Sequence, residues 1–197
     1  MRIAVFGASG KTGRLVIEQG LERGHEMVAF VRDASRFGRS QERLEVVEGD
    51  ARDPDDVVPA LRGSDAAISV ISLARPEDEP QHSEATRTIV EAAKTEGVRR
   101  IVVTANNHAF HDEEVPPDLA AFAREHRRNR DLLRSSGLDW TLVASPTLAD
   151  EESAGSYSAS ADEKAPGKRT ARVDLADAAL DALGQDDWIG HIVGVSS

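Results

Sequence analysis

The chain has 197 residues, and 24 Lys and Arg against 35 Asp and Glu give it a formal net charge of −11. The length is typical of one domain, and the negative charge argues against a nucleic-acid partner, because such partners select for a basic surface. The absence of Cys excludes a disulfide framework, a thiolate metal site and a thiol nucleophile. We therefore expect residues 1–197 to form a single domain.

No segment predicts a membrane span. One of the most apolar uncharged runs, Ala66–Ala74, holds nine residues, whereas a helix needs about 20 to cross a bilayer. The N-terminus enters an apolar run at Ile3 without a charged leader, which predicts no secretory signal. We expect a cytoplasmic protein that contacts no membrane and is a monomer or weak dimer.

Short β-branched apolar runs alternate with longer stretches of helical period, which predicts an α/β fold with a mostly parallel sheet. The predicted strands are Ile3–Phe6, Met27–Val31, Leu44–Val47, Ala66–Ile71, Ile101–Thr104, Trp140–Val143 and His191–Val195. The predicted helices are Lys11–Arg23, Pro54–Leu61, Pro80–Thr95, Pro117–Ser135 and Val173–Leu183. Between the last helices, Ser145–Gly167 is rich in small and polar residues and predicts a long surface excursion.

A glycine motif joins the first predicted strand to the first predicted helix. Its spacing is Gly-x-x-Gly-x-x-Gly, whereas a P-loop needs four residues between its glycines. Glycines in this position let backbone N–H groups approach a pyrophosphate at a helix N-terminus, which predicts a dinucleotide-binding Rossmann fold. A glycine-rich turn without a ligand is the alternative. The cofactor-binding residues expected here are Gly7, Ser9, Gly10, Lys11, Thr12 and Gly13.

The end of the second predicted strand indicates which dinucleotide is bound. Arg32 follows that strand and Arg36 comes one helical turn later. Two guanidinium groups suit the 2′-phosphate of NADP, whereas NAD sites place an acid here. Asp33 could serve a ribose instead, or the segment could be a solvated turn. NADP(H) is thus the predicted cofactor, with NAD(H) the less favoured one.

Two acids follow the third predicted strand. Asp50, after Gly49, is placed to accept a hydrogen bond from the adenine amino group. Asp53 precedes Pro54 and is typical of a helix N-cap.

Together these segments resemble the atypical short-chain dehydrogenase/reductase families that bind NAD(P)H, including the NmrA-like proteins. Within that group the chain is most similar to the flavin reductase/biliverdin-IXβ reductase type, and the likeness covers nearly all of it. The residues that carry it are Phe6–Gly13, Arg32–Arg36, Gly49–Asp50, Val115–Pro117, His126, Leu133–Thr141 and Gly190–His191.

The resemblance implies hydride transfer from NADPH to flavins or related conjugated acceptors. It implies a substrate pocket formed mainly by residues 104–172, with His126 in the pocket and Thr104 beside the nicotinamide as the catalytic candidates. The further cofactor contacts expected from it are Ala51, Leu73, Thr104, Ser145 and Pro146.

The chain departs from the family pattern in two places. Ser145-Pro146-Thr147 stands where the reductases have a second histidine, and Ala105–His108 replaces the usual small hydroxyl residues. The Tyr-x-x-x-Lys pair of ordinary dehydrogenases is also missing, because Ala161 stands four residues after Tyr157. Carbonyl reduction is therefore disfavoured, whereas a flavin acceptor can take its proton from solvent.

His126 falls on the predicted inward face of its helix. That face comprises Leu119, Phe122, His126, Asn129 and Leu133. His126 could face a ligand, or it could be a core histidine bonded to a backbone carbonyl.

His108 and His111 have metal-like spacing beside three consecutive acids, but a solvated acidic patch is the expected interpretation and we predict no metal. Four arginines between 124 and 130 are expected to be solvated or paired with acids, although one could meet a flavin phosphate.

We therefore predict an NADPH-dependent oxidoreductase whose partner is a small conjugated acceptor such as a flavin, quinone or tetrapyrrole. A non-catalytic NADP(H) sensor of the NmrA-like type is the main alternative. Quinone-reductase or epimerase chemistry on the same scaffold is the other.

Overall fold

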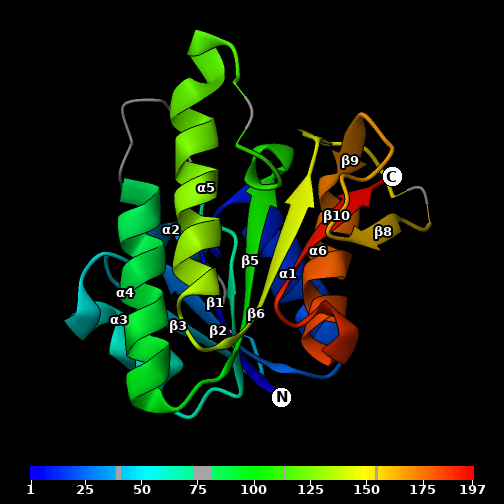
Figure 1. Cartoon of the computed structure of the whole chain (residues 1–197). Coiled ribbons are helices and arrows are strands. Elements are labelled where there is room, and N and C mark those ends of the chain that lie inside the picture. Colours follow the sequence, from blue (N-terminus) through cyan, green and yellow to red (C-terminus); the bar gives the residue numbers. More distant parts are fainter. Residues whose placement is uncertain (39–40, 73–80, 113, 154) are drawn as a thin grey trace.

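The computed structural model describes residues 1–38, 41–72, 81–112, 114–153 and 155–197, apart from the side chain of Arg36. Strands and helices alternate along most of the chain (Figure 1). The strands are β1 (Arg2–Phe6), β2 (Glu26–Val31), β3 (Leu44–Glu48), β4 (Ala66–Ser69), β5 (Arg100–Asn106), β6 (Asp139–Ser145), β7 (Thr147–Ala149), β8 (Ser158–Ala161), β9 (Arg169–Ala171) and β10 (His191–Ser196). The α-helices are α1 (Lys11–Glu22), α2 (Ala34–Phe37), α3 (Pro54–Leu61), α4 (Gln81–Glu96), α5 (Ala120–Arg134) and α6 (Arg172–Asp181). Short 3₁₀ turns are η2 (Asn107–Ala109), η3 (Pro117–Leu119), η4 (Ala182–Gly184) and η5 (Asp186–Trp188).

The main sheet has the strand order β3-β2-β1-β4-β5-β6-β10-β8. Its pairs are parallel except for β8, which runs antiparallel to β10. This is the predicted doubly wound Rossmann fold. The order reverses direction at β1, whose neighbours are β2 and β4. In such sheets a crevice opens at the carboxyl ends of the strands on either side of the reversal, and ligands bind there.

Helices cover both faces of the sheet, with α3, α4 and α5 on one side and α1 and α6 on the other (Figure 1). Alternate residues of each strand feed the two cores, so Phe6 packs under the first group of helices while Val5 packs under the second. Both side chains are fully buried. Because both faces are covered, the strands are nearly continuous apolar runs, as the sequence indicated.

The predicted strands and helices are confirmed in the described residues, apart from shifts of one or two residues at several ends and the differences that follow. β4 ends at Ser69, two residues early, and Pro117–Leu119 is a 3₁₀ turn before α5. The predicted excursion 145–167 was only partly correct, because β7 pairs with β9 and β8 extends the main sheet. These strands are short and polar, and backbone pairing to distant strands forms them, so no hydrophobic period marks them.

Candidate functional site

The turn between β1 and α1 is shaped by glycine. Gly7 has a φ of +83°, a conformation that side chains disfavour. The Gly10 N–H donates to the Gly7 carbonyl oxygen at 3.0 Å, and α1 begins at the next residue. No side chain caps the helix at Gly10, so the first N–H groups of α1 are available to an anion.

Gly13 lets α1 pack directly against this turn. A Cβ atom at this position would lie 2.2 Å from the Gly7 carbonyl oxygen and 2.7 Å from the Ala8 Cα. Real Cβ atoms do not approach that closely, so the third glycine of the motif is a steric requirement of the turn itself.

A cavity of about 310 Å³ lies over the turn, at the carboxyl ends of β1, β2 and β4. Its other walls are Phe30–Arg32 after β2, Asp50–Arg52 after β3, Val70–Ser72 after β4 and three residues of α4. The sequence-predicted residues that line it are Gly7, Ser9, Gly10, Arg32, Asp50 and Ala51. The structure thus joins residues from three separate βα junctions in one cavity.

Other predicted cofactor residues do not line this cavity. Thr12 is buried in α1, and the Lys11 ammonium is paired with Asp150, which also accepts a hydrogen bond from Arg172 Nε at 2.5 Å. This carboxylate thereby ties the glycine turn to the start of α6. Leu73 and the Arg36 side chain lie outside the described residues.

The cavity end nearest β2 carries Arg32. Asp33 beside it is committed elsewhere, because its carboxylate caps α2 by accepting from Ser35 N at 3.1 Å. Within the described part of the chain, the exposed Arg32 guanidinium has no ion-pair partner. The segment therefore offers an uncompensated positive charge at the cavity, whereas the nearby acid is engaged by the protein's own backbone.

Asp50 lies at the same end of the cavity and is bound by Arg52. The Arg52 Nε donates to its two oxygens at 3.0 and 3.2 Å. This hydrogen bonding, and the positive charge of Arg32 to a smaller degree, lower the pKa of Asp50 to about 2. Asp53, by contrast, caps α3 by accepting from Asp55 N at 3.0 Å, as the sequence predicted.

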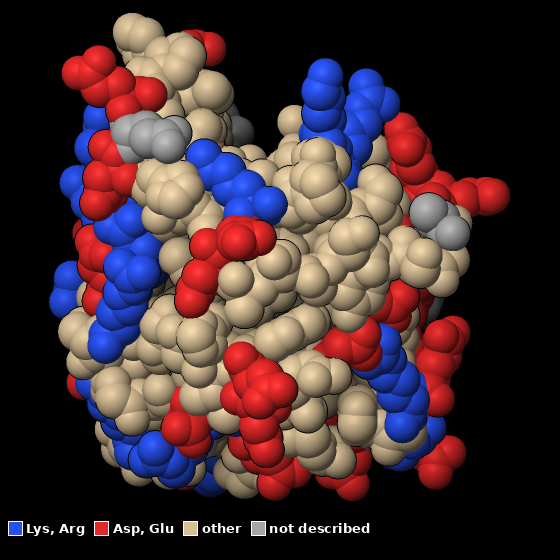
Figure 2. Space-filling view, turned by 45° about the vertical axis from the view of Figure 1, so that its right-hand side comes forward, with Lys and Arg blue, Asp and Glu red and all other residues tan. Residues whose placement is uncertain are grey.

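Thr104, Ser145 and Pro146 lie at the carboxyl ends of β5 and β6. The Thr104 Oγ1 donates to the Ser69 carbonyl oxygen at 3.5 Å, and Ser145 is buried opposite Asn106. They are not among the cavity-lining residues but share its sheet edge. Figure 2 shows this edge as a notch between the N-terminal end of α5 and basic side chains beside β9.

His126 is partly buried in α5 and does not line the cavity. Its ring packs edge-on against that of His82, with centroids 5.6 Å apart at 87°. Burial, reinforced by His82 and then His108, lowers the pKa of His126 to about 3. Its Nδ1 atom is buried without a hydrogen-bond partner among the described residues. The predicted inward position is confirmed for His126, but Leu119 is exposed because it precedes the helix.

The histidine that does line the cavity is His82, in the first turn of α4. It is only 3% exposed. The Asn129 Nδ2 lies 3.2 Å from its Nε2 and 3.4 Å from its Nδ1. Desolvation is the largest influence on His82 and lowers its pKa, against a smaller opposing effect of Glu125. His82 therefore presents a neutral imidazole to the cavity near pH 7.

Glu125 of α5 caps the start of α4. Its fully buried carboxylate accepts from Ser83 N at 2.8 Å, from Ser83 Oγ at 3.1 Å and from Arg128 Nη1 at 2.6 Å. Orphan N–H groups at a helix start need such an acceptor. The carboxylate thus fixes the turn that carries His82 to the cavity wall.

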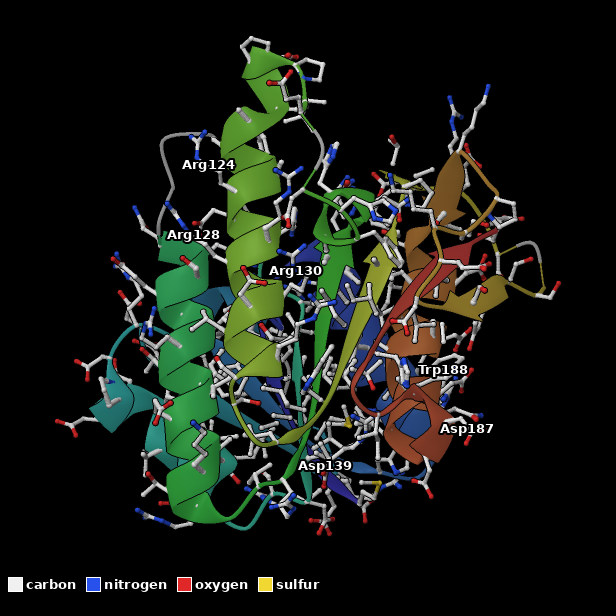
Figure 3. All side chains as sticks on the ribbon, viewed as in Figure 1. Arg124, Arg128, Arg130, Asp139, Asp187 and Trp188 are labelled. Carbon is white, nitrogen blue, oxygen red and sulfur yellow. The ribbon has the colours of Figure 1, made fainter. Side chains whose placement is uncertain are left out.

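Three arginines of α5 bind carboxylates and backbone carbonyls of the chain itself. Arg130 donates to the Ala109 carbonyl at 3.2 Å and to Asp112 at 3.0 Å, and Arg127 donates to the His111 carbonyl at 2.9 Å. Figure 3 shows Arg124, Arg128 and Arg130 along this helix. The prediction of pairing with acids is confirmed for Arg127, Arg128 and Arg130. The chain 107–112 after β5 is held against α5 by these contacts.

His82 and Arg52 are cavity residues that the sequence did not single out. Neither belongs to a spaced motif. The available signal for Arg52 was its place directly after the predicted adenine-end residues Asp50 and Ala51. For His82 there was none, because helical phase alone does not say which face of α4 meets the glycine turn.

Comparison with known protein families shows to which family the chain belongs. The model of a family described as NAD(P)H-binding matches residues 7–186 of the chain. The chain belongs to this NAD(P)H-binding family. The match begins at Gly7, the first glycine of the turn that forms the cavity floor.

Curated relatives of this family member include reductases. YwnB of Bacillus subtilis is 28% identical over 80% of this chain and 78% of its own length. Quinone oxidoreductase 2 of Escherichia coli is 30% identical over 72% of this chain and 47% of its own length. The 3-diazoavenalumate denitrifying reductase of a Streptomyces species is 34% identical over 75% of this chain and 56% of its own length. The chain therefore spans about half of each reductase.

Solved structures share the fold. The oxidoreductase ylbE of Lactococcus lactis superposes with a TM-score of 0.88 at 19% identity, covering 100% of this chain and 91% of that one. A short-chain dehydrogenase/reductase of Veillonella parvula, solved with NADP, gives 0.83 at 17%, covering 100% and 94%. These likenesses show that the chain shares the Rossmann fold of these proteins.

Two further findings concern membrane-spanning helices and metal-binding clusters. No helix within the described ranges is long and apolar enough to cross a membrane. Across the same ranges, no three His, Asp or Glu side chains are arranged to hold a metal ion.

The partly buried His126 should make stability depend on pH. Because its pKa is about 3 when folded and near 6.5 when unfolded, the unfolded chain binds a proton that the folded chain does not. The free energy of unfolding should therefore fall as pH drops from about 6.5 toward 3, by up to about 1.4 kcal/mol per pH unit. Urea unfolding at pH 7 and pH 5 would measure this.

His126→Phe should reduce that pH dependence, leaving the part that the lowered pKa of His82 contributes. Replacement of the exposed His111 by phenylalanine is the matched control. An equal slope in wild type and His126→Phe would contradict the assignment of the effect to His126.

Proposed function

We propose that this protein is an NADPH-dependent reductase that delivers hydride to a flavin-like or other conjugated small molecule. The observation that carries the proposal is the cavity over the glycine turn, with Arg32 at its far end. The residues present suit a dinucleotide, because the turn through Gly7 and Gly10 leaves the first backbone N–H groups of α1 open to a pyrophosphate. When bound, a reduced nicotinamide supplies the hydride.

NADP is preferred over NAD in this proposal because of the charges at the adenosine end. Arg32 lacks an ion-pair partner among the described side chains, while Asp33 is used as the cap of α2. A free guanidinium suits a phosphate dianion, and a committed carboxylate is a poor acceptor for ribose hydroxyls.

Arg32→Ala should weaken NADPH binding about 10- to 100-fold and leave NADH affinity within about twofold, because charge-assisted hydrogen bonds to one phosphate are lost. Calorimetric titration of both cofactors would measure the two affinities. NADH serves as the internal control, since it shares every group except the 2′-phosphate. An unchanged ratio of the two affinities would reject the phosphate assignment.

The acceptor is proposed to be a conjugated ring system that needs no positioned acid. Tyr157 donates its hydroxyl to Asp181, which together with burial raises the pKa of Tyr157, and no Lys follows it at the required spacing. One relative is named as a quinone oxidoreductase. We propose that residues 104–172 form the side of the site that binds the hydride acceptor. Thr104 and Ser145 are its polar groups, and His126 contributes through its ring contact with His82.

The test is NADPH oxidation with a panel of FMN, FAD, riboflavin, quinones and linear tetrapyrroles. We expect turnover with at least one of these acceptors and slower turnover with NADH. The loss of reduced-nicotinamide absorbance follows the reaction directly. Failure of NADPH and NADP⁺ to bind, seen as no calorimetric heat and no change in melting temperature, would overturn the proposal.

A non-catalytic NADP(H) sensor is the second candidate, and one observation favours it. Two titratable groups on the cavity wall are poorly suited to deliver a proton, since Asp50 is bound to Arg52 and the buried His82 has a lowered pKa. Tight NADPH binding without turnover on the whole panel would support the sensor and reject the reductase.

A further inference from the structure

Arg52 lines the cavity, and Asp50 holds the plane of its guanidinium group. Its Nε donates to both oxygens of Asp50, and its Nη2 donates to Oδ2, so guanidinium and carboxylate lie side by side. The Asp50 Oδ1 also accepts the backbone N–H of Arg52 at 2.9 Å. Paired hydrogen bonds of this kind fix the orientation of a guanidinium as well as its position.

The backbone that carries the pair is held on three sides. The Asp50 N–H donates to Asp56 Oδ2 at 2.9 Å, and its carbonyl accepts from Asp53 N at 2.9 Å. From the neighbouring helix α4, Thr88 Oγ1 donates to the Arg52 carbonyl at 3.3 Å. Little conformational freedom is left to lose on binding, which favours a ligand contact at this place.

The two arginines at this end of the cavity differ in whether an acid balances their charge. Arg52 is neutralised by Asp50, whereas Arg32 carries an unbalanced positive charge among the described side chains. A phosphate dianion gains most from Arg32. A neutral heteroaromatic base needs no net charge and can stack on a flat guanidinium face, and the Arg52 side chain is 45% exposed.

We propose that Arg52 recognises the adenine base of the dinucleotide by presenting its guanidinium plane, and that Asp50 positions Arg52 and does not read the adenine amino group. This rests on the proposed function, in which a dinucleotide occupies the cavity. It assigns Asp50 a different role from the direct adenine contact that the sequence suggested, since both carboxylate oxygens are already used by Arg52.

The first test compares Arg52→Ala with wild type by calorimetric titration of NADPH, NADH and reduced nicotinamide mononucleotide, which lacks the adenosine half. Loss of the platform should weaken NADPH and NADH by the same factor, about 5- to 30-fold. Binding of the mononucleotide should not change. Arg52→Phe should recover most of the affinity, because a phenyl ring offers a stacking face without charge.

Arg62→Ala is the matched control, since Arg62 is an exposed arginine of the same segment that does not line the cavity. A loss confined to NADPH would make Arg52 a phosphate ligand and overturn the proposal, as would unchanged affinity for both dinucleotides. Thermal unfolding without ligand checks that each variant is folded.

The second test addresses Asp50 with the NADPH analogue that carries hypoxanthine in place of adenine. Hypoxanthine replaces the amino group by a carbonyl but keeps a flat ring, so wild-type affinity for the two should agree within about twofold. Asp50→Asn should weaken both equally by loosening Arg52. A tenfold preference of the wild type for adenine that Asp50→Asn abolishes would show direct reading by Asp50 and reject the positioning role.

These outcomes are distinguishable from failure of the proposed function. Absence of any dinucleotide binding to wild type would remove the reductase proposal before the variants are compared. If the adenine assignment alone is wrong, wild type still binds and oxidises NADPH while Arg52→Ala shows unaltered affinity.

Discussion

Gly13→Ala should destabilise the protein by about 3 kcal/mol and weaken NADPH binding at least about tenfold. The added Cβ would lie 2.2 Å from the Gly7 carbonyl oxygen and within 3 Å of two Ala8 backbone atoms. Because all three neighbours are backbone, no side chain can rotate away, and the turn or α1 must shift. The same turn forms the cavity floor, so stability and cofactor affinity should fall together. Urea unfolding and calorimetric titration measure the two quantities.

Gly184→Ala is the matched control, because a Cβ there meets nothing within 4 Å. Its effect on the free energy of unfolding should stay below about 1 kcal/mol. Wild-type stability and NADPH affinity in Gly13→Ala would show that the close approach of α1 to the turn is not required.

Glu125→Ala should lower the free energy of unfolding by about 2–4 kcal/mol. The substitution removes the carboxylate that accepts from the buried N–H and Oγ of Ser83 and that pairs with Arg128. The first turn of α4 should loosen, and with it the cavity wall formed by Gln81 and His82. Urea unfolding gives the stability change, and hydrogen exchange of the Ser83 amide reports the local loosening.

Glu91→Ala provides the control on α4, because Glu91 is exposed and pairs only with the neighbouring Lys94 among the residues described. Its cost should stay below about 0.5 kcal/mol. Glu125→Gln should fall between the two, since it keeps an acceptor oxygen but loses the charge. An unaltered urea midpoint in Glu125→Ala would contradict the capping role of this carboxylate.

Sequence patterns were sufficient to predict those features that depend on a single short segment. The glycine turn, the Asp53 cap and most strand and helix positions follow from patterns within a few residues, and the structure confirms them. The strands β7, β8 and β9 were missed because their pairing partners are remote and their sequences are polar. The four-residue helix α2 was also missed, since so short an element leaves no period to detect.

The residues at the cavity show the same division. Gly7, Gly10, Arg32 and Asp50 could be named because each follows a strand whose carboxyl end must lie at one sheet edge. The alternatives for His126 could not be resolved by helical phase, which places a side chain inward but does not identify its neighbour. Only the packing of α5 on α4 brings His126 against His82 and leaves the latter on the cavity wall.

The amino-acid sequence by itself determined the parallel sheet, the glycine turn and the NAD(P)-binding motif, because strand periodicity and glycine spacing can be recognised within short stretches of chain. Tertiary structure alone decided the role of Glu125, which is buried as the cap of α4. Asp33 and Asp50 are bound by donors only two residues along the chain, so that one caps α2 and the other holds Arg52. A carboxylate takes its role from the donors that the fold brings within hydrogen-bonding distance, and for Glu125 those donors include an amide 42 residues away along the chain.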